Sequence, residues 1–223
     1  MQQNFKDVSA VAPGILATNK VIRNTYLLLS MTVLFSALTA FISTSLQIAL
    51  PFWAILLGYF GLLYMTSATA NSAMGLVSVF LFTGFMGLTL GPTLNYYIHG
   101  FSNGPELVTA ALASTGALFF ALSGYAMTTR KDFSYMGGFL FIGLTIALLV
   151  SIAGLFFNMP GLQLAISGAI VLLMSGYLLY QTSLIINGGE RNYIMATVSL
   201  YITLLNLFTS LLQLLAAFSG RRD

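Results

Sequence analysis

The sequence predicts an all-α membrane protein with seven transmembrane helices. Of its 223 residues, 58% are hydrophobic and only 6% are charged, against about 25% in an ordinary soluble domain. Too little polar surface remains to face water, so the natural solvent of this chain is a lipid bilayer. The apolar residues form long continuous runs without the alternating pattern of a transmembrane barrel, and this indicates helices.

Seven apolar runs are long enough to cross a bilayer, which takes about 20 residues. Turn-forming or charged residues separate them, among them Pro51, Asn71 and Pro105. The second run is short, and six spans followed by a re-entrant last segment is the alternative. We expect the spans at 25–46, 50–67, 74–98, 106–128, 133–156, 160–186 and 194–218.

The N-terminal segment 1–19 is mixed polar and too short to bury a core. It does not resemble a cleaved signal peptide, because the first apolar run is too long. We therefore expect a flexible cytoplasmic tail at 1–19, followed by a seven-helix transmembrane domain at 20–223.

Positive charge predicts that the N-terminus is cytoplasmic. Only the pair Arg221 and Arg222 opposes this orientation, unless the last segment turns back to the cytoplasm. The basic residues that would lie in the cytoplasm are Lys6, Lys20, Arg23, Arg130, Lys131 and Arg191.

Neutral polar residues form a stripe on each of two predicted spans. Such a stripe is typical of packing contacts between helices, and the alternative is a polar interior or a water-filled cavity. Either interpretation places the last span against protein rather than lipid. The first span carries Thr25, Thr32, Ser36, Thr39 and Ser43, and the last carries Ser199, Thr203, Asn206, Ser210 and Gln213.

Known catalytic patterns are missing from the sequence. All charged residues fall at or outside the ends of the spans, there is no cysteine, and the single histidine, His99, falls in an expected external loop. No phosphate-binding loop, zinc-protease motif or dinucleotide fingerprint occurs. We expect neither an enzyme nor a protein with a cofactor or a metal centre.

The third predicted span contains GFMGLTLGP at 84–92. Gly84, Gly87 and Gly91 fall near one face, which allows close helix packing. Pro92 predicts a kink about one turn before Asn95, as a packing device or to expose carbonyls toward a pathway.

Four segments resemble the Bax inhibitor-1 family and, within it, the bacterial YccA-like branch of FtsH protease modulators. They are KVIRNTYLLLSMTVLFSALTA (20–40), FTGFMGLTLGP (82–92), TTRKDFSYMGG (128–138) and GGERNYIMATVSLYITLLNLFTSLL (188–212). The matching signature residues are Arg23, Asn24, Tyr26, Gly87, Gly91, Pro92, Gly188, Gly189, Tyr193, Tyr201 and Asn206.

The resemblance implies a fold in which six helices surround a central seventh. It also implies a bacterial inner-membrane protein that binds and restrains an FtsH-type ATP-dependent membrane protease. The N-terminal tail would be the segment that the protease engages.

Other members of the family are described as pH-sensitive calcium leaks. The resemblance associates that activity with one acidic residue on each of the last two helices and with a nearby arginine on the second helix of the fold. Here the acidic positions hold Gln181 and Thr203, and the span 50–67 has no arginine. With Asn206, they form a candidate polar seam or degenerate ion site. A calcium leak is the alternative function, without the proton switch of a carboxylate pair.

Overall fold

Seven helices make up the described part of the chain in the computed structural model. The backbone is described for residues 4–154 and 160–220, and side chains for 18–154 and 161–220. The helices are α1 (Asn4–Ser45), α2 (Phe52–Thr69), α3 (Met74–Gly100), α4 (Gly104–Thr129), α5 (Met136–Gly154), α6 (Pro160–Ile186) and α7 (Tyr193–Ser219).

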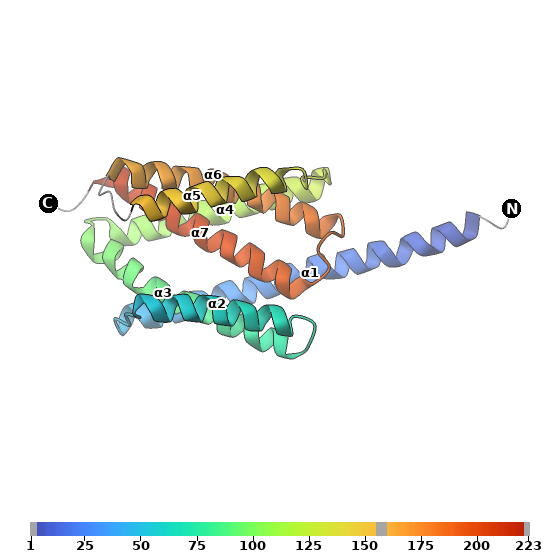
Figure 1. Cartoon of the computed structure of the whole chain (residues 1–223), viewed down its shortest axis with the longest axis horizontal. Helices are drawn as coiled ribbons and strands as arrows, with labels where there is room; N and C mark the ends of the chain where they lie inside the picture. Colours follow the sequence, from blue (N-terminus) through green and yellow to red (C-terminus); the bar gives the residue numbers. More distant parts are fainter. Residues whose placement is uncertain (1–3, 155–159, 221–223) are drawn as a thin grey trace.

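Every one of these helices is long and apolar enough to cross a membrane. The predicted spans and the seven-helix fold are therefore confirmed, with small differences at the helix ends. The re-entrant alternative is wrong, because α7 is one continuous helix whose end lies opposite the projecting start of α1 (Figure 1). Arg221 and Arg222 lie outside the described residues.

The N-terminal segment has a helical backbone, and its flexibility stays a prediction. Within the predicted flexible tail 1–19, the backbone from Asn4 onward is the first part of α1. This first part of α1 projects beyond the bundle formed by the rest of α1 and the other six helices (Figure 1). A membrane-anchored helix can extend outward because each added residue gains one hydrogen bond without a new nucleation cost. The membrane-spanning part of α1 begins at Thr18.

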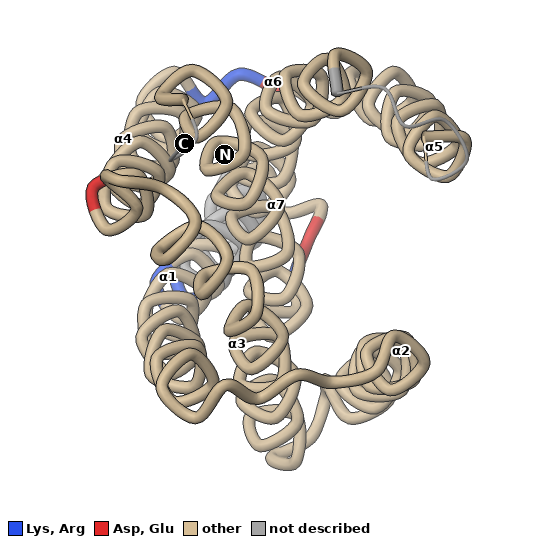
Figure 2. Tube along the Cα trace, turned by 90° about the vertical axis from the view of Figure 1, so that its left-hand side faces the viewer, with Lys and Arg blue, Asp and Glu red and all other residues tan. Residues whose placement is uncertain are grey.

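Helix α7 is the central element of the bundle, as the family resemblance implies. It packs against α1, α3, α4 and α6 and touches α2, whereas α5 contacts only α6 within the described residues. The end-on view shows α2 and α5 at the periphery (Figure 2). Their outward side chains, among them Phe60 and Phe141, are exposed as expected for lipid-facing surfaces.

The polar stripe of the first span is a packing surface against α3 and α7. Thr25, Thr32, Ser36 and Ser43 are buried, and Ser43 Oγ donates to the Leu88 carbonyl at 2.7 Å. Glycines of α3 allow α1 to pack this closely against it. A Cβ added at Gly91 would overlap Ser43, and one added at Gly87 would overlap Thr39, which also belongs to the stripe.

Helix α3 continues through Pro92 and changes direction in its last part (Figure 1). Proline lacks a backbone N–H, which accounts for a bend at this position. After the bend, Asn95 Nδ2 donates to the carbonyl of Thr44 at 3.1 Å. His99 lies in the last turn of α3 and not in a loop, because the helix extends to Gly100.

Candidate functional site

Gln181 of α6 and Thr203 of α7 face each other inside the bundle. Thr203 Oγ1 lies 3.2 Å from Gln181 Oε1 and 2.9 Å from the carbonyl oxygen of Ser199, and it can donate to either. Both side chains are buried, with exposed fractions of 8% for Gln181 and 2% for Thr203. The two positions for which the family resemblance predicts acids in other members therefore hold a neutral, buried contact in this protein.

The two residues after Gln181 are also buried and polar, and each contacts a different part of the protein. Thr182 Oγ1 lies 3.3 Å from Ser123 Oγ on α4 and 3.5 Å from Tyr26 Oη on α1. Ser183 Oγ accepts from the backbone N–H of Phe133 at 2.9 Å and donates to the Lys131 carbonyl at 3.1 Å. The run 181–183 thus joins α6 to α7, to α4 and α1, and to the α4–α5 loop.

Sequence reasoning identified Gln181 but missed Thr182 and Ser183. Hydroxyl side chains in a transmembrane helix commonly bond the carbonyl one turn back, so their presence alone predicts no contact. The signal that could have drawn attention to them was three consecutive polar residues, because such a run points in three directions around a helix.

Asn206 lies on the same side of α7 but is not bonded to the Gln181–Thr203 pair. Its Nδ2 donates to the Ile202 carbonyl at 2.8 Å within α7, and its side chain is half-buried. Farther along the stripe, Ser167 Oγ of α6 donates to Gln213 Oε1 at 2.8 Å. The predicted seam is therefore a series of separate contacts, most of them between α6 and α7.

A second polar cluster joins α7 to α1 and α3. Tyr201 Oη lies 2.6 Å from Ser36 Oγ and 3.2 Å from the carbonyl oxygen of Thr83. One turn earlier, Thr197 Oγ1 lies 3.3 Å from the carbonyl oxygen of Thr25. Buried polar groups need such partners, because water is absent from the membrane interior.

The turn that contains Gly188 and Gly189 closes the end of α6. Gly188 has a φ of +75°, in the left-handed region that glycine adopts most readily. The N–H groups of Gly189 and Glu190 both donate to the Leu184 carbonyl, at 2.8 and 3.1 Å. These bonds satisfy a terminal carbonyl as in a helix C-cap.

Asn192 begins α7 and ties it to the α2–α3 loop. Its Oδ1 accepts from the backbone N–H groups of Ile194 and Met195 at 3.0 and 3.2 Å, which is an N-cap. Its Nδ2 donates to the Ala70 carbonyl at 3.1 Å and to Asn71 Oδ1 at 2.9 Å. Sequence reasoning missed this residue, because only the fold brings 71 next to 192.

The signature residues occupy three places. Gly87, Gly91 and Pro92 lie on α3, where the two glycines pack against α1. Gly188 and Gly189 form the α6–α7 turn, which Tyr193, Tyr201 and Asn206 follow on α7. On α1, Arg23 is exposed, whereas Asn24 and Tyr26 are half-buried.

The chemistry available in the seam is that of neutral hydrogen-bonding groups. Glutamine, threonine and asparagine side chains do not gain or lose a charge near neutral pH. Within the described residues, no three His, Asp or Glu side chains are grouped so that they could hold a metal ion. The arrangement is suited to fixing helices against one another and lacks the elements of a proton switch.

Comparison with known proteins identifies relatives along nearly the whole chain. A family model described as "Inhibitor of apoptosis-promoting Bax1" matches residues 18–220. "Modulator of FtsH protease YccA" of Escherichia coli K12 is 48% identical over 209 residues, 93% of this chain and 94% of that protein. A protein of E. coli O6:H1 with the same identity is named "Inner membrane protein YccA".

An uncharacterized protein of Pseudomonas aeruginosa PAO1 is 49% identical over 220 residues, 98% of each chain. The family match includes the α1–α3 contact, the α6–α7 turn and the central helix, and the two alignments cover 93% and 98% of this chain. The chain therefore belongs to the Bax inhibitor-1 family.

Proposed function

We propose that this protein is a membrane-embedded regulator that binds and restrains an FtsH-type ATP-dependent protease. The observation that carries the proposal is the 48% identity to a relative named as a modulator of FtsH protease, over 93% of this chain. Similarity of this extent includes the whole bundle and not one motif. It favours a shared partner more strongly than fold similarity alone would.

The projecting start of α1 supports a role in contacting the protease. Its backbone extends beyond the other helices from Asn4 to the beginning of the membrane span at Thr18 (Figure 1). A terminal helix outside the packed bundle opens at low free-energy cost. An ATP-driven protease could therefore engage it without unfolding the membrane domain.

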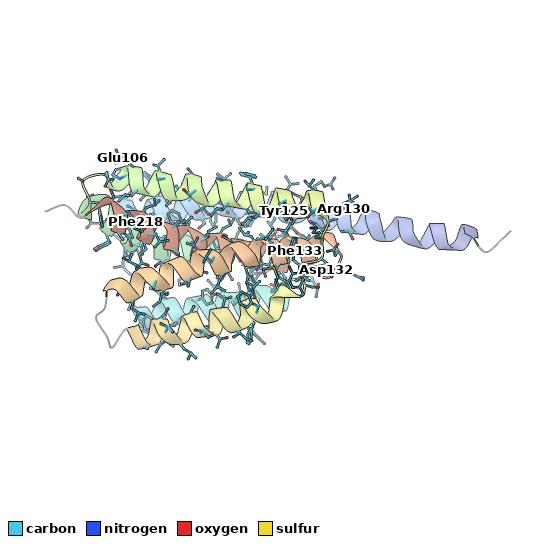
Figure 3. The ribbon with its side chains drawn as sticks, turned by 90° about the horizontal axis from the view of Figure 1, so that it is seen from above. Glu106, Tyr125, Arg130, Asp132, Phe133 and Phe218 are labelled. Carbon is cyan, nitrogen blue, oxygen red and sulfur yellow. The ribbon has the colours of Figure 1, made fainter. Side chains whose placement is uncertain are left out.

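The charge distribution supports a cytoplasmic N-terminus in a bacterial inner membrane. Figure 3 shows Arg130 at the end of the bundle from which α1 projects, with Glu106 and Phe218 at the other end. The chain order of the helices places the other described lysines and arginines, Lys20, Arg23, Lys131 and Arg191, at the same end as Arg130. Positive residues accumulate on the cytoplasmic side of membrane proteins.

The neutral seam makes a regulatory role the better candidate than an enzyme or a calcium leak. A proton-gated leak of the family type needs two carboxylates, and the corresponding side chains here are the bonded pair Gln181 and Thr203. Hydrolytic catalysis needs a nucleophile beside a base. The single histidine, His99, is exposed at the end of α3.

A membrane pull-down tests the proposal directly. The intact chain and a variant lacking residues 2–17 would be purified in mild detergent from cells that express an FtsH-type protease. We expect the intact chain to retain the protease and to slow degradation of a membrane substrate, and the shortened chain to lose most of both effects. The deletion ends before Thr18, so the membrane span remains complete.

A chain with residues 2–17 replaced by a Gly/Ser linker of the same length is the control for the length of the segment. If the intact chain fails to retain the protease, the proposed function is wrong. If the linker variant binds and restrains the protease like the intact chain, the sequence of the N-terminal helix does not form the contact.

A further inference from the structure

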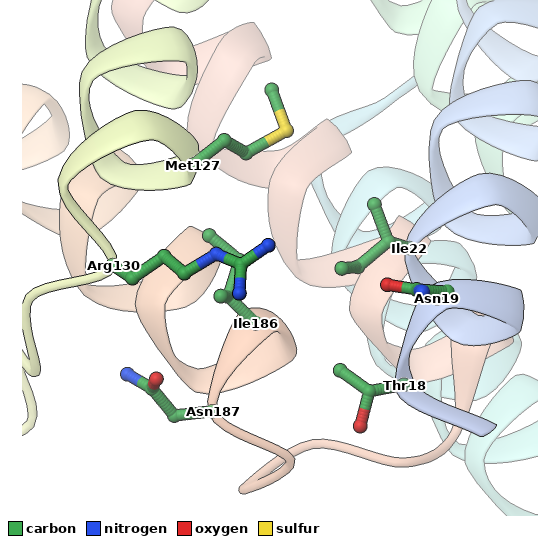
Figure 4. Close-up of a pocket in the computed structure, with 7 residues that line it drawn as sticks. All are labelled: Thr18, Asn19, Ile22, Met127, Arg130, Ile186 and Asn187. Atoms are coloured by element: carbon green, nitrogen blue, oxygen red, sulfur yellow. The ribbon is translucent and has the colours of Figure 1, made fainter. Parts of the chain in front are cut away.

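A cavity of about 400 Å³ opens at the end of the bundle, between α1, α4 and α6. Its polar lining consists of Thr18, Asn19, Arg130 and Asn187, and the Arg130 guanidinium points across the cavity toward α1 (Figure 4). The polar seam lies elsewhere, so neither the proposed regulation nor the packing of α7 accounts for this cavity.

Arg130 lacks a counterion in the described part of the chain. No hydrogen bond or ion pair joins its guanidinium to any described residue. The two described acids at this end have other partners: Asp132 Oδ1 accepts from the Ser134 N–H at 2.8 Å, and Glu190 Oε1 accepts from the Asn192 N–H at 2.7 Å. An arginine fork therefore remains free to bind an anion.

The backbone at Arg130 is unusual for an arginine. Its φ of 51° is left-handed, and it caps α4 with its N–H on the Ala126 carbonyl at 2.9 Å. Glycine and asparagine adopt this conformation at lower cost. Capping α4 therefore does not require an arginine. Its presence at this position points to a use of the charged side chain rather than of the backbone.

The carbonyl groups at the end of α6 do not serve as acceptors for the Arg130 guanidinium. The end of α6 is closed by N–H donors on the carbonyls of Ser183, Leu184 and Ile185. Because these carbonyls have partners, the guanidinium is not needed to neutralise that helix end. The adjacent Lys20 and Lys131 are exposed and add positive charge around the cavity.

The remaining lining indicates which anion would fit. Ile22, Met127 and Ile186 give the cavity an apolar side next to its polar groups. It lies at the level where the span of α1 begins and α4 and α6 end, at Thr18, Thr129 and Ile186. This is the depth at which lipid phosphates meet acyl chains. A phospholipid offers both kinds of surface at once, whereas a free phosphate offers only charge.

We propose that this cavity binds a phosphate group, with Arg130 as its anchor and the headgroup of an anionic phospholipid as the favoured source. Arginine forms two parallel hydrogen bonds with phosphate oxygens, and the Asn19 side chain lies on the facing wall of the cavity. The inference is independent of the protease, since it depends only on the bundle.

The test compares lipid binding to the full chain and to two asparagine variants. Native mass spectrometry would titrate the detergent-solubilised protein with phosphatidylglycerol and with phosphatidylcholine of the same acyl chains. We expect wild type to prefer phosphatidylglycerol and Arg130→Asn to bind it about tenfold more weakly. Lys131→Asn, which removes a neighbouring charge outside the cavity, should stay within about twofold of wild type. Because asparagine suits the left-handed cap, Arg130→Asn should melt no lower than wild type, so lost binding would not reflect lost folding.

A second titration, with inorganic phosphate against chloride at equal ionic strength, separates the two sources. Inorganic phosphate could raise the thermal stability of wild type but not of Arg130→Asn, while wild type shows no preference for phosphatidylglycerol. That result would assign the cavity to a free phosphate compound. Equal loss of lipid binding in the two variants would overturn the proposal in favour of general surface charge. The absence of both lipid preference and phosphate effect in wild type would also overturn it.

Discussion

Thr203 of the central helix lies within hydrogen-bonding distance of Gln181 on α6, with 3.2 Å between Oγ1 and Oε1. Both residues stand where leak-forming relatives are expected to carry acids. A carboxylate pair at this place would repel when both members are ionised, whereas the neutral pair attracts at every physiological pH. We therefore expect the neutral pair to hold α6 against α7 without a pH-dependent step.

Replacing Thr203 by valine should lower the free energy of unfolding by about 0.6 to 1 kcal/mol, because Gln181 Oε1 would lose its donor in a buried site. The measurement is thermal unfolding in detergent. Thr209→Val is the matched control, since among the described residues Thr209 Oγ1 donates only within α7, to the Leu205 carbonyl at 3.0 Å and the Asn206 carbonyl at 3.1 Å. Equal losses in the two variants would contradict a stabilising contact between α6 and α7.

Placing aspartate at both Gln181 and Thr203 should make stability depend on pH. Aspartates ionise near pH 4 in an unfolded chain, but two buried carboxylates repel once both are charged. The folded state then holds protons more tightly than the unfolded state, so the variant should lose stability as pH rises from about 5 to 8. Melting temperatures across this range, with Gln181→Asn and Thr203→Ser as a neutral double control, provide the check. If the melting temperature of the aspartate variant changes with pH no more than that of the control, the two side chains are solvated or lie apart.

Calcium flux into proteoliposomes gives a separate measurement on the wild-type chain. Because Gln181 and Thr203 do not titrate, any flux should be the same at pH 6 and pH 8. A change in flux of severalfold over this range would require a titrating gate outside the seam.

The sequence predicted the seven spans and the packing of α7 against protein because both follow from patterns along the chain, whereas the central position of α7 was implied by the family resemblance. Apolar runs give the helices, and the stripe from Ser199 to Gln213 implies a neighbour on that side. It also identified Gln181 and Thr203, through a resemblance. The sequence allows their direct contact but does not require it, since the rotation of two packed helices depends on the whole bundle.

The missed features depend on contacts between distant parts of the chain. Asn192 bonds Asn71 across 121 positions, and no local pattern predicts that pairing. The helical course of residues 4–19 was missed for another reason. Mixed polar composition indicates disorder on average, but a helix already anchored in the membrane can extend through such a segment.

Asn192→Ala should lower the free energy of unfolding by about 1 to 2 kcal/mol, because it removes the cap on Ile194 and Met195 together with the link to the α2–α3 loop. Asn192→Ser keeps a capping oxygen but loses the bridge, so its loss should be smaller. Thermal unfolding of both variants measures the difference. If serine and alanine are equally destabilising, the bridge and not the cap is the dominant contribution.

Gly91→Ala should weaken the contact between α1 and α3. The added Cβ would overlap the side chain of Ser43, whose hydroxyl donates to the Leu88 carbonyl at 2.7 Å. Since a packed interface yields only by moving a helix, we expect a loss of about 1 to 3 kcal/mol in the free energy of unfolding. Gly124→Ala on α4 is the matched control, because beyond its own helix backbone no described atom would lie within 4 Å of its Cβ. There alanine should leave stability unchanged or raise it through its higher helix propensity. Thermal unfolding in the same detergent compares the two, and an unaltered Gly91→Ala melting temperature would mean that α1 and α3 can separate slightly without cost.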